Sequence, residues 1–317
     1  MPATEPAALT QVDELPRAQE LREALRLASP SPACALFALL DGARIPKLWV
    51  MLRELKVEHA CLFRESPNEN LTRVAPFLAR FDAADDLVLW LAMQDSALEA
   101  AVFLFAETRP HALYKHLRRF LMVLDTDGNE NYLRFYDPRV LRPFLAASTH
   151  AQKQQFFGPI RRFVAYDSVA SEAAGKLLFL RWEPPAPEPD APEVRPPSAT
   201  DMFRLSKQHE TAFDRDSMER YDRRCIAFLR QRYSPKLGNK TDAEVQQVID
   251  QAKQLGPALG LPSGRDVAVV AELLVLGFPS EARQKIESLA RKDRPGAIQV
   301  LRDRLMMHQM GPVSVAE

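Results

Sequence analysis

The sequence predicts an α/β protein, with a mixed-sheet lobe and flanking helices over residues 1–182 and a smaller all-helical lobe over residues 201–317. Three observations support this fold class. Short apolar runs alternate with helix-period segments before residue 182, residues 183–200 are rich in proline, and apolar residues follow a 3.6-residue period afterwards.

The elements of the first lobe follow from short patterns in chain order. Apolar residues at helical spacing predict a helix over residues 12–25. A second helix is expected over residues 44–55, with Pro46 in its first turn, and a third is opened by Pro110. Continuous apolar runs predict buried strands at residues 33–40, 59–63 and 101–105 and a closing strand at 177–182.

The segment from Lys115 to Leu141 is the most informative part of the lobe. Two apolar runs flank a cluster that contains Asp127-Gly128, which is the strongest short-range signal of a hairpin. The second run stops at Asp137-Pro138, where Asp can cap a helix and Pro suits the first helical position. The segment therefore predicts strand, tight turn, strand and helix, and the hairpin makes the sheet mixed.

Seven prolines lie between residues 183 and 200, with Glu and Ala among them. Such a stretch lacks backbone donors and favours an extended polyproline conformation of about 3.1 Å per residue. We expect an exposed, semi-rigid linker, and a ligand for a proline-recognition domain is the alternative.

The second lobe repeats the helical period. Thr241 to Glu244 forms a capping box before an amphipathic run, which Gly256-Pro257 stops. Further helical patterns lie around residues 218–228, 267–274 and 298–305.

Composition limits the classes of function. The 42 basic and 42 acidic residues balance, so the chain has no global attraction to nucleic acid or to an anionic membrane. No apolar run reaches the roughly 20 residues that a membrane span needs, and Met1 to Leu9 does not resemble a secretory signal. The three cysteines are far apart, which suits a cytoplasmic protein without a disulfide framework or zinc site.

Candidate catalytic and metal sites are weak. Asp125 to Asn129 has the wrong glycine position for a calcium loop, so a hairpin turn is favoured. His111 and His116 are five positions apart and would face different sides of a helix. The carboxylates at 82, 85 and 86 precede a helix, where the dipole favours negative charge. We therefore expect no metal, no cofactor and no catalytic residue.

The arginines around the hairpin are the main candidates for binding a partner. Their planar forks could bind phosphate or carboxylate groups. In the alternative, Arg134 pairs with Asp137 or a helix terminus and the others are solvated. We expect Asp137 to cap the following helix and Arg139 or Arg118 to be available to a partner. The partner-binding candidates are Arg118, Arg119, Arg134, Tyr136 and Arg139, and the structural motif comprises Asp41, Gly42, Asp137 and Pro138.

Six short motifs, taken in this order, resemble the bacterial type VI secretion adaptor family, effector chaperones catalogued as a domain of unknown function. The resemblance covers about residues 33–165, and the proline-rich linker is longer than the family pattern. The motifs are Leu39-Leu40-Asp41-Gly42-Ala43-Arg44, Cys61-Leu62-Phe63, Ala75-Pro76-Phe77-Leu78, His116-Leu117-Arg118-Arg119, Arg134-Phe135-Tyr136-Asp137-Pro138-Arg139-Val140-Leu141 and Phe156-Phe157-Gly158-Pro159-Ile160.

The resemblance implies a compact α/β lobe, a variable helical lobe and no catalysis. Family members hold a toxic effector in the cytoplasm and deliver it to the VgrG spike, often beside a PAAR tip. The sequence thus favours an adaptor whose partners are an effector and VgrG, with no nucleic acid and no membrane. The alternative is a hydrolase or other enzyme that acts on a phosphorylated ligand through the arginine cluster, with His116 as the nearby candidate base.

Overall fold

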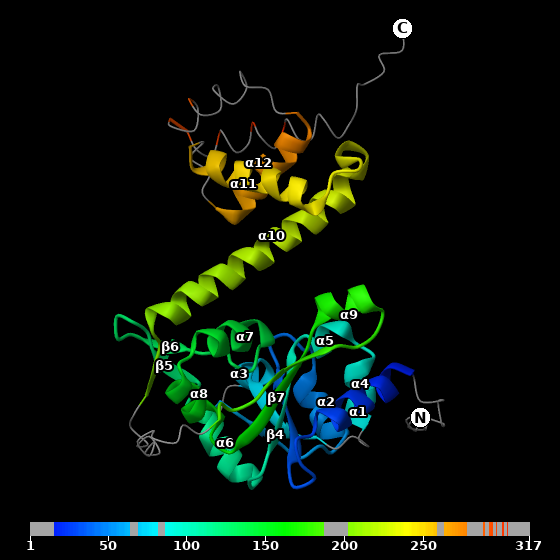
Figure 1. The fold of residues 1–317 in the computed structure, drawn as a ribbon, viewed down its shortest axis with the longest axis vertical. Coiled ribbons are helices and arrows are strands. Elements are labelled where there is room, and N and C mark those ends of the chain that lie inside the picture. The colour runs from blue at the N-terminus through cyan, green and yellow to red at the C-terminus, as the bar shows by residue number, and fades with distance from the viewer. Residues whose placement is uncertain are drawn as a thin grey trace, which may run out of the picture. The chain divides into compact units, whose positions relative to one another are not determined.

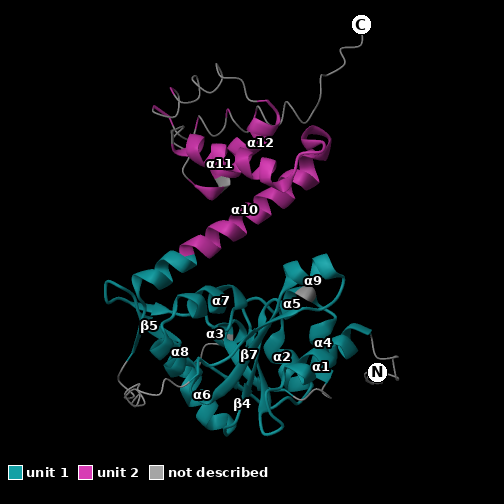
Figure 2. Ribbon diagram, viewed as in Figure 1, with its two compact units in different colours: residues 1–213 teal, residues 214–317 magenta. Residues whose placement is uncertain are grey.

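The computed structural model describes residues 16–63, 69–81, 86–186, 202–258 and 263–277, with a few single residues between 288 and 303. The chain divides into two compact units, residues 1–213 and residues 214–317 (Figure 2). The first combines sheets with helices and the second, where described, is helical. The predicted α/β class with a helical C-terminal part is therefore confirmed.

A six-stranded sheet forms the centre of the first unit (Figure 1). Its strand order is β2-β3-β1-β4-β7-β8, and every neighbouring pair is antiparallel. The strands are β1 (Ala35–Asp41), β2 (His59–Cys61), β3 (Pro76–Arg80), β4 (Ala101–Ala106), β7 (Ile160–Tyr166) and β8 (Phe179–Trp182).

Helices cover both faces of this sheet, so alternate residues of a central strand enter different cores. In β1, Ala38 and Leu40 belong to the first core, whereas Phe37 and Leu39 belong to the second. Burial on both faces explains why the sequence of β1 is a continuous apolar run rather than an alternating one.

The helices divide between the two cores by their buried residues. The first core is covered by α1 (Pro16–Ala28), α2 (Leu48–Glu54), α4 (Asp86–Ala92) and α5 (Asp95–Leu98). The second core is covered by α6 (Pro110–Arg118), α7 (Pro138–Ala147) and α8 (His150–Phe157). Two short helices, α3 (Glu69–Arg73) and α9 (Ser168–Ala174), complete the unit.

The predicted hairpin forms a second, three-stranded sheet. Strands β5 (Met122–Leu124) and β6 (Glu130–Tyr132) pair antiparallel, and β9 (Phe203–Arg204) adds to β5 in parallel. Mixed pairing therefore occurs in the small sheet, while the large one is antiparallel. Asp125 holds the turn, because its Oδ1 accepts hydrogen bonds from the backbone N–H of Asp127 and Asn129 at 2.9 and 2.8 Å. The Asp125 carboxylate therefore stabilises a hairpin turn, which the sequence favoured over a calcium loop.

The first unit extends past the proline-rich stretch. We expected the helical part to begin at residue 201, but the division lies after Phe213. The physical reason is burial, since Phe203 and Leu205 are 3% and 9% exposed in the second core. Of the expected linker, residues 187–200 lie outside the described residues.

The second unit has its own core of apolar side chains from three helices, α10 (Lys207–Leu237), α11 (Asp242–Ala258) and α12 (Gly264–Val275). The predicted capping box is present, because the Thr241 N–H donates to Glu244 Oε2 at 2.7 Å and the Glu244 N–H donates to Thr241 Oγ1 at 3.3 Å. On α10, Asp216 pairs with Arg220 one turn later. The helical pattern expected around residues 298–305 lies largely outside the described residues.

Candidate functional site: a polar corner between two cores

Strand β1 ends in a tight turn built on Asp41. The Asp41 carbonyl accepts hydrogen bonds from the N–H groups of Arg44 and Ile45 at 3.0 and 2.9 Å, and its Oδ1 accepts from the Ala43 N–H at 3.0 Å. Gly42 donates its N–H to the Ala75 carbonyl at 3.0 Å. A Cβ at position 42 would lie 2.4 Å from that oxygen, so this close backbone approach requires glycine.

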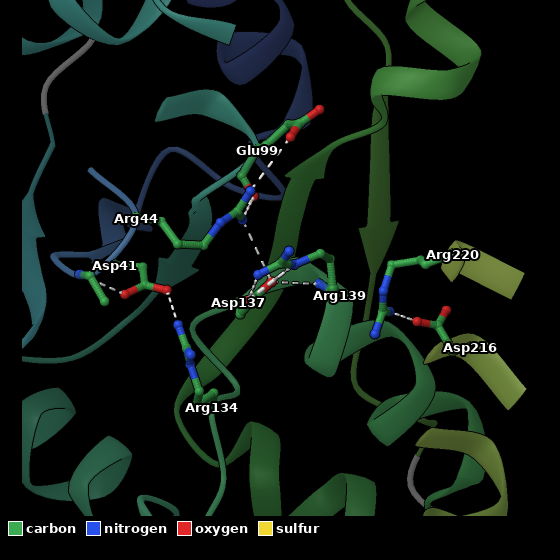
Figure 3. Close-up of polar contacts among 9 residues, drawn as sticks. Asp41, Arg44, Glu99, Arg134, Asp137, Arg139, Asp216 and Arg220 are labelled. Atoms are coloured by element: carbon green, nitrogen blue, oxygen red, sulfur yellow. Dashed lines mark hydrogen bonds and ion pairs between the residues drawn. The ribbon is translucent and has the colours of Figure 1, made fainter. Parts of the chain in front are cut away.

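Five charged residues meet at this turn, and we call them the polar corner: Asp41, Arg44, Arg134, Asp137 and Arg139 (Figure 3). They come from the end of β1 and the turn after it, the segment after β6 and the start of α7. Phe135, which lies between Arg134 and Asp137 in the chain, is fully buried in the second core. Its burial fixes the backbone that carries Arg134 and Asp137.

Asp41 and Arg134 form the first ion pair of the polar corner. Arg134 Nη2 donates to Asp41 Oδ2 at 2.5 Å, although the two residues are 93 positions apart. The Asp41 side chain is 1% exposed and the Arg134 side chain is 42% exposed. Arg134 thus neutralises a buried carboxylate from the solvent side, and its partner is Asp41 rather than the Asp137 considered from the sequence.

Asp137 caps α7 as predicted. Its backbone is extended, its Oδ1 accepts from the Arg139 N–H at 3.0 Å, and Pro138 occupies the first turn. The side chain of Arg139 then binds the same carboxylate, with Nε 2.9 Å from Oδ1 and Nη2 2.6 Å from Oδ2. This forked geometry commits Arg139 to a 2%-exposed partner within the chain.

Arg44 links the polar corner to Glu99, the residue that follows α5. Its Nη1 lies 3.8 Å from Asp137 Oδ1 and donates to the Glu99 carbonyl at 2.7 Å. Its Nη2 lies 3.5 Å from Glu99 Oε2. With Glu99 included, three cations face three carboxylates, so the charges of the network balance.

The protonation equilibria agree with this pairing. Burial of the Asp137 carboxyl opposes its ionisation, but hydrogen bonds from Arg139 and the charges of Arg139 and Arg44 outweigh that effect and lower its pKa. Burial raises the pKa of Tyr136 to about 12, although the charge of Arg134 opposes the shift. Tyr136 is 5% exposed and its ring lies 5.7 Å from the Arg134 guanidinium. Its ring therefore offers little surface to a partner.

The other two candidate arginines belong to the end of α6. The Arg118 guanidinium lies 5.3 Å over the Tyr114 ring and donates to its hydroxyl at 3.3 Å. Arg119 is exposed at the C-cap of the helix. Within the described part of the chain, no hydrogen bond or ion pair joins either of them to the polar corner. The structure thus gathers Arg134, Tyr136 and Arg139 but not the α6 arginines.

His116 is held between α6 and α8. Its Nε2 lies 2.8 Å from the Phe156 carbonyl and its ring packs 5.3 Å from that of Phe120. Gly158 covers the ring so closely that a Cβ there would lie 2.4 Å from His116 Cε1. Burial lowers the pKa of His116, which favours the neutral form in a structural role.

A buried histidine that the sequence did not single out anchors the start of α10. His209 is fully buried, and its Nδ1 accepts from the Ser206 N–H at 3.0 Å. Ser148 Oγ donates to the Phe144 carbonyl at 2.7 Å, so His209 Nε2, 3.0 Å away, donates to Ser148 Oγ. Burial lowers the pKa of His209. The two ends of this contact are 61 positions apart, which left no local signal.

The described residues contain neither a candidate metal site nor a candidate membrane-spanning helix. No three of their His, Cys, Asp or Glu side chains gather as metal ligands, and none of their helices is long and apolar enough to cross a bilayer. None of the three cysteines forms a disulfide, and burial is the main cause that raises the pKa of Cys34 and Cys225.

Comparison with known proteins gives one match. Residues 36–155 match the model of a family described as "Domain of unknown function (DUF4123)". No curated protein and no solved structure matches the chain. The matched range contains the whole polar corner and ends before β9 and His209.

Proposed function

We propose that the protein is a non-enzymatic adaptor of a bacterial type VI secretion system, which binds a cognate toxic effector and delivers it to the VgrG spike. One observation carries the proposal. The family match over residues 36–155 contains five of the six motifs by which the sequence resembles type VI adaptors, and the sixth follows it directly at Phe156. The match supports an adaptor role in general, and the effector and the spike enter from the resemblance.

The chemistry of the polar corner favours a structural role over catalysis. Arg134 and Arg139 are each paired with a carboxylate of the chain, and both carboxylates are almost fully buried. Burying a charge is costly unless it is paired, so these arginines stabilise the fold. A phosphorylated ligand would have to compete with Asp41 and Asp137 for the same guanidinium forks.

The hydrolase considered from the sequence has weaker support. It needs a base beside the arginines, and His116 was the candidate. His116 instead bonds the Phe156 carbonyl and is covered by Gly158. A phosphatase assay with p-nitrophenyl phosphate checks this alternative, since turnover by the wild-type protein that disappears in Arg134→Ala would contradict the proposal.

The proposed place of action is the bacterial cytoplasm, where an adaptor would meet its effector before secretion. The absence of a disulfide among Cys34, Cys61 and Cys225 suits a reducing compartment. The PAAR tip is a further possible neighbour through the resemblance, because family members often act beside it.

Co-purification tests the proposal. A tagged copy expressed in the native bacterium should retain the toxin encoded beside its gene, and that toxin should become less abundant when the adaptor gene is deleted. Arg181→Glu, on the exposed edge strand β8, serves as a surface-charge control that should keep the toxin. Normal toxin abundance in the deletion strain, with no toxin on the tagged protein, would refute the proposal.

A further inference from the structure

Strand β2 forms one edge of the six-stranded sheet. Among the described strands its only neighbour is β3. The Arg80 N–H donates to the Glu58 carbonyl at 2.7 Å and the Leu62 N–H donates to the Pro76 carbonyl at 2.9 Å. Because hydrogen-bonded pairs alternate in antiparallel sheets, the N–H and C=O of His59 point away from β3. This edge therefore offers backbone groups to a further strand.

A groove of about 680 Å³ runs along this edge. We call it the edge groove, and its main walls are Trp49, Arg53, His59, Phe77, Arg80 and Tyr114. The size falls within the range of ligand sites in proteins, which is roughly 300–1,000 Å³.

Two aromatic walls of the edge groove, Trp49 and Tyr114, belong to opposite faces of the sheet. Trp49 on α2 packs against the first core, and Tyr114 on α6 packs against the second. Successive side chains of a β-strand point to opposite faces. A strand added beside β2 would thus direct one side chain toward Trp49 and the next toward Tyr114, a geometry that a helix does not provide.

The charge of the edge groove is unbalanced. Arg80 pairs with Glu58 at 3.4 Å. Arg53 is exposed, its guanidinium lies 5.6 Å over the Trp49 ring, and no acidic partner for it occurs in the described part of the chain. One cation therefore remains to complement a carboxylate on the incoming segment.

We propose that the edge groove binds an extended peptide segment of a partner protein, which adds to β2 as a further strand and pairs an acidic side chain with Arg53. Backbone hydrogen bonds to His59 hold the segment, and alternating apolar side chains contact Trp49 and Tyr114. This inference goes beyond the adaptor role and does not depend on the identity of the effector.

Random 12-residue peptides displayed on phage, selected against the purified full chain, provide the probe. Selected peptides should alternate apolar residues and carry an acidic one. Arg53→Glu should weaken the binding of their synthetic copies by at least about tenfold, as expected for loss of a charge-assisted bond. Arg181→Glu, on the opposite edge strand β8, is the matched control and should bind like wild type.

Two readouts separate backbone pairing from side-chain contact. In the wild-type protein, exchange of the His59 amide hydrogen should slow when the peptide is bound. His59→Pro removes that donor and should abolish binding, whereas Arg181→Pro removes the outward donor of β8 and should not. Melting curves identify a variant that fails to fold, and the exchange measurement stands without any variant.

Three results would overturn the inference. They are the absence of selected peptides, peptides that bind Arg53→Glu as tightly as wild type with no change at the His59 amide, and protection of that amide by self-association at high protein concentration. The last would assign the edge to a second copy of the chain. None of these results bears on co-purification with the toxin, so the two proposals fail independently.

Discussion

At the scale of single residues, the charged side chains of the polar corner pair with one another. Asp41 and Asp137 are the buried members, and Arg134 and Arg139 reach them from the partly exposed side. A carboxylate in this position needs its partner more than the arginine does, because the arginine retains contact with water. Arg139, which was expected from the sequence to be available to a partner, is therefore paired within the fold, and so is Arg134.

Substitutions of Asp137 and Arg139 test this assignment. Asp137→Ala should lower the free energy of unfolding by about 0.5–2 kcal/mol, since it removes the cap of α7. Arg139→Ala should cost about 1–2 kcal/mol, because it withdraws a fork from a buried carboxylate while its own exposure limits the effect. An Arg139 side chain available to a partner, as expected from the sequence, would instead leave stability nearly unchanged on substitution by Ala. Urea denaturation measures both.

The control for these variants is Arg181→Ala, an exposed substitution that should remain within about 0.5 kcal/mol of wild type. If Arg139→Ala is as stable as this control, Arg139 contributes nothing to the fold and becomes free for a partner again.

The same pair predicts a pH dependence. The folded pKa of Asp137 lies below its ordinary value of 3.8, so its ionised form stabilises the fold above that pH. This contribution is lost as the pH falls through the lower, folded pKa. Asp137→Asn keeps a capping oxygen but lacks the charge. Its deficit in unfolding free energy should be constant near neutral pH and shrink below about pH 3.8.

At the scale of elements, the sequence predicted the features that depend on residues close together in the chain. Asp127-Gly128 and Asp137-Pro138 have their effects within a few residues, so the hairpin and the cap of α7 were predictable. Strand β3 begins with Pro76, and a proline in an apolar run argues against a strand in the sequence. In β7, Arg161 and Arg162 interrupt the apolar run, and the two strands were therefore missed.

The candidate site was predictable only in part. Its residue types were visible in the sequence, but the pairing of Asp41 with Arg134 spans 93 positions and that of Ser148 with His209 spans 61. Such contacts depend on how β1, α7 and α10 pack, and no local spacing encodes them. Strand β9 was also not predicted, because a two-residue strand gives no periodic signal in the sequence.

The contact of His209 predicts how the start of α10 responds to acid. His209 lies among the rings of Phe144, Phe203 and Phe213 and is neutral when folded. Its folded pKa is below 6.5, so the unfolded chain binds the proton first. Its contribution is complete above about pH 6.5, and stability falls as the pH drops from there toward the folded pKa.

The measurement is the free energy of unfolding of wild type and His209→Gln across this pH window. The variant should be less stable near neutral pH, and the difference should narrow on acidification. His116 shifts in the same direction, so the difference between the two proteins is the informative quantity. His111→Gln, at an exposed position, controls for loss of an imidazole and should unfold with about the wild-type free energy near neutral pH. A constant difference for His209→Gln would mean that folding does not change the pKa of His209.

At the scale of the whole molecule, the first unit requires residues beyond the proline-rich stretch. Phe203, Leu205 and His209 are all buried in it. A chain that ends at residue 213 should therefore fold cooperatively, while one that ends at residue 200 should melt about 10 °C lower or more. The estimate assumes a loss of about 4–5 kcal/mol from the missing apolar side chains, at roughly 2–4 °C for each kcal/mol.

Limited proteolysis of the full chain supplies an independent check. The first cut is expected between Glu183 and Thr200, where proline-rich sequence favours an exposed connection. The fragments should then stay associated until denatured, because β9 pairs with β5. Equal melting temperatures for the two shortened chains would show that residues 201–213 add nothing to the first unit.

Secretion by the native bacterium tests the central claim, that this protein is the adaptor of one effector, most directly. The abundance of every type VI effector in the culture medium is measured by mass spectrometry for wild type, for a strain that lacks this gene and for the complemented strain. The account predicts that only the toxin encoded beside the gene disappears from the medium and returns on complementation. Loss of every effector would indicate a structural component of the secretion machine, and unchanged export of all of them would contradict the adaptor role.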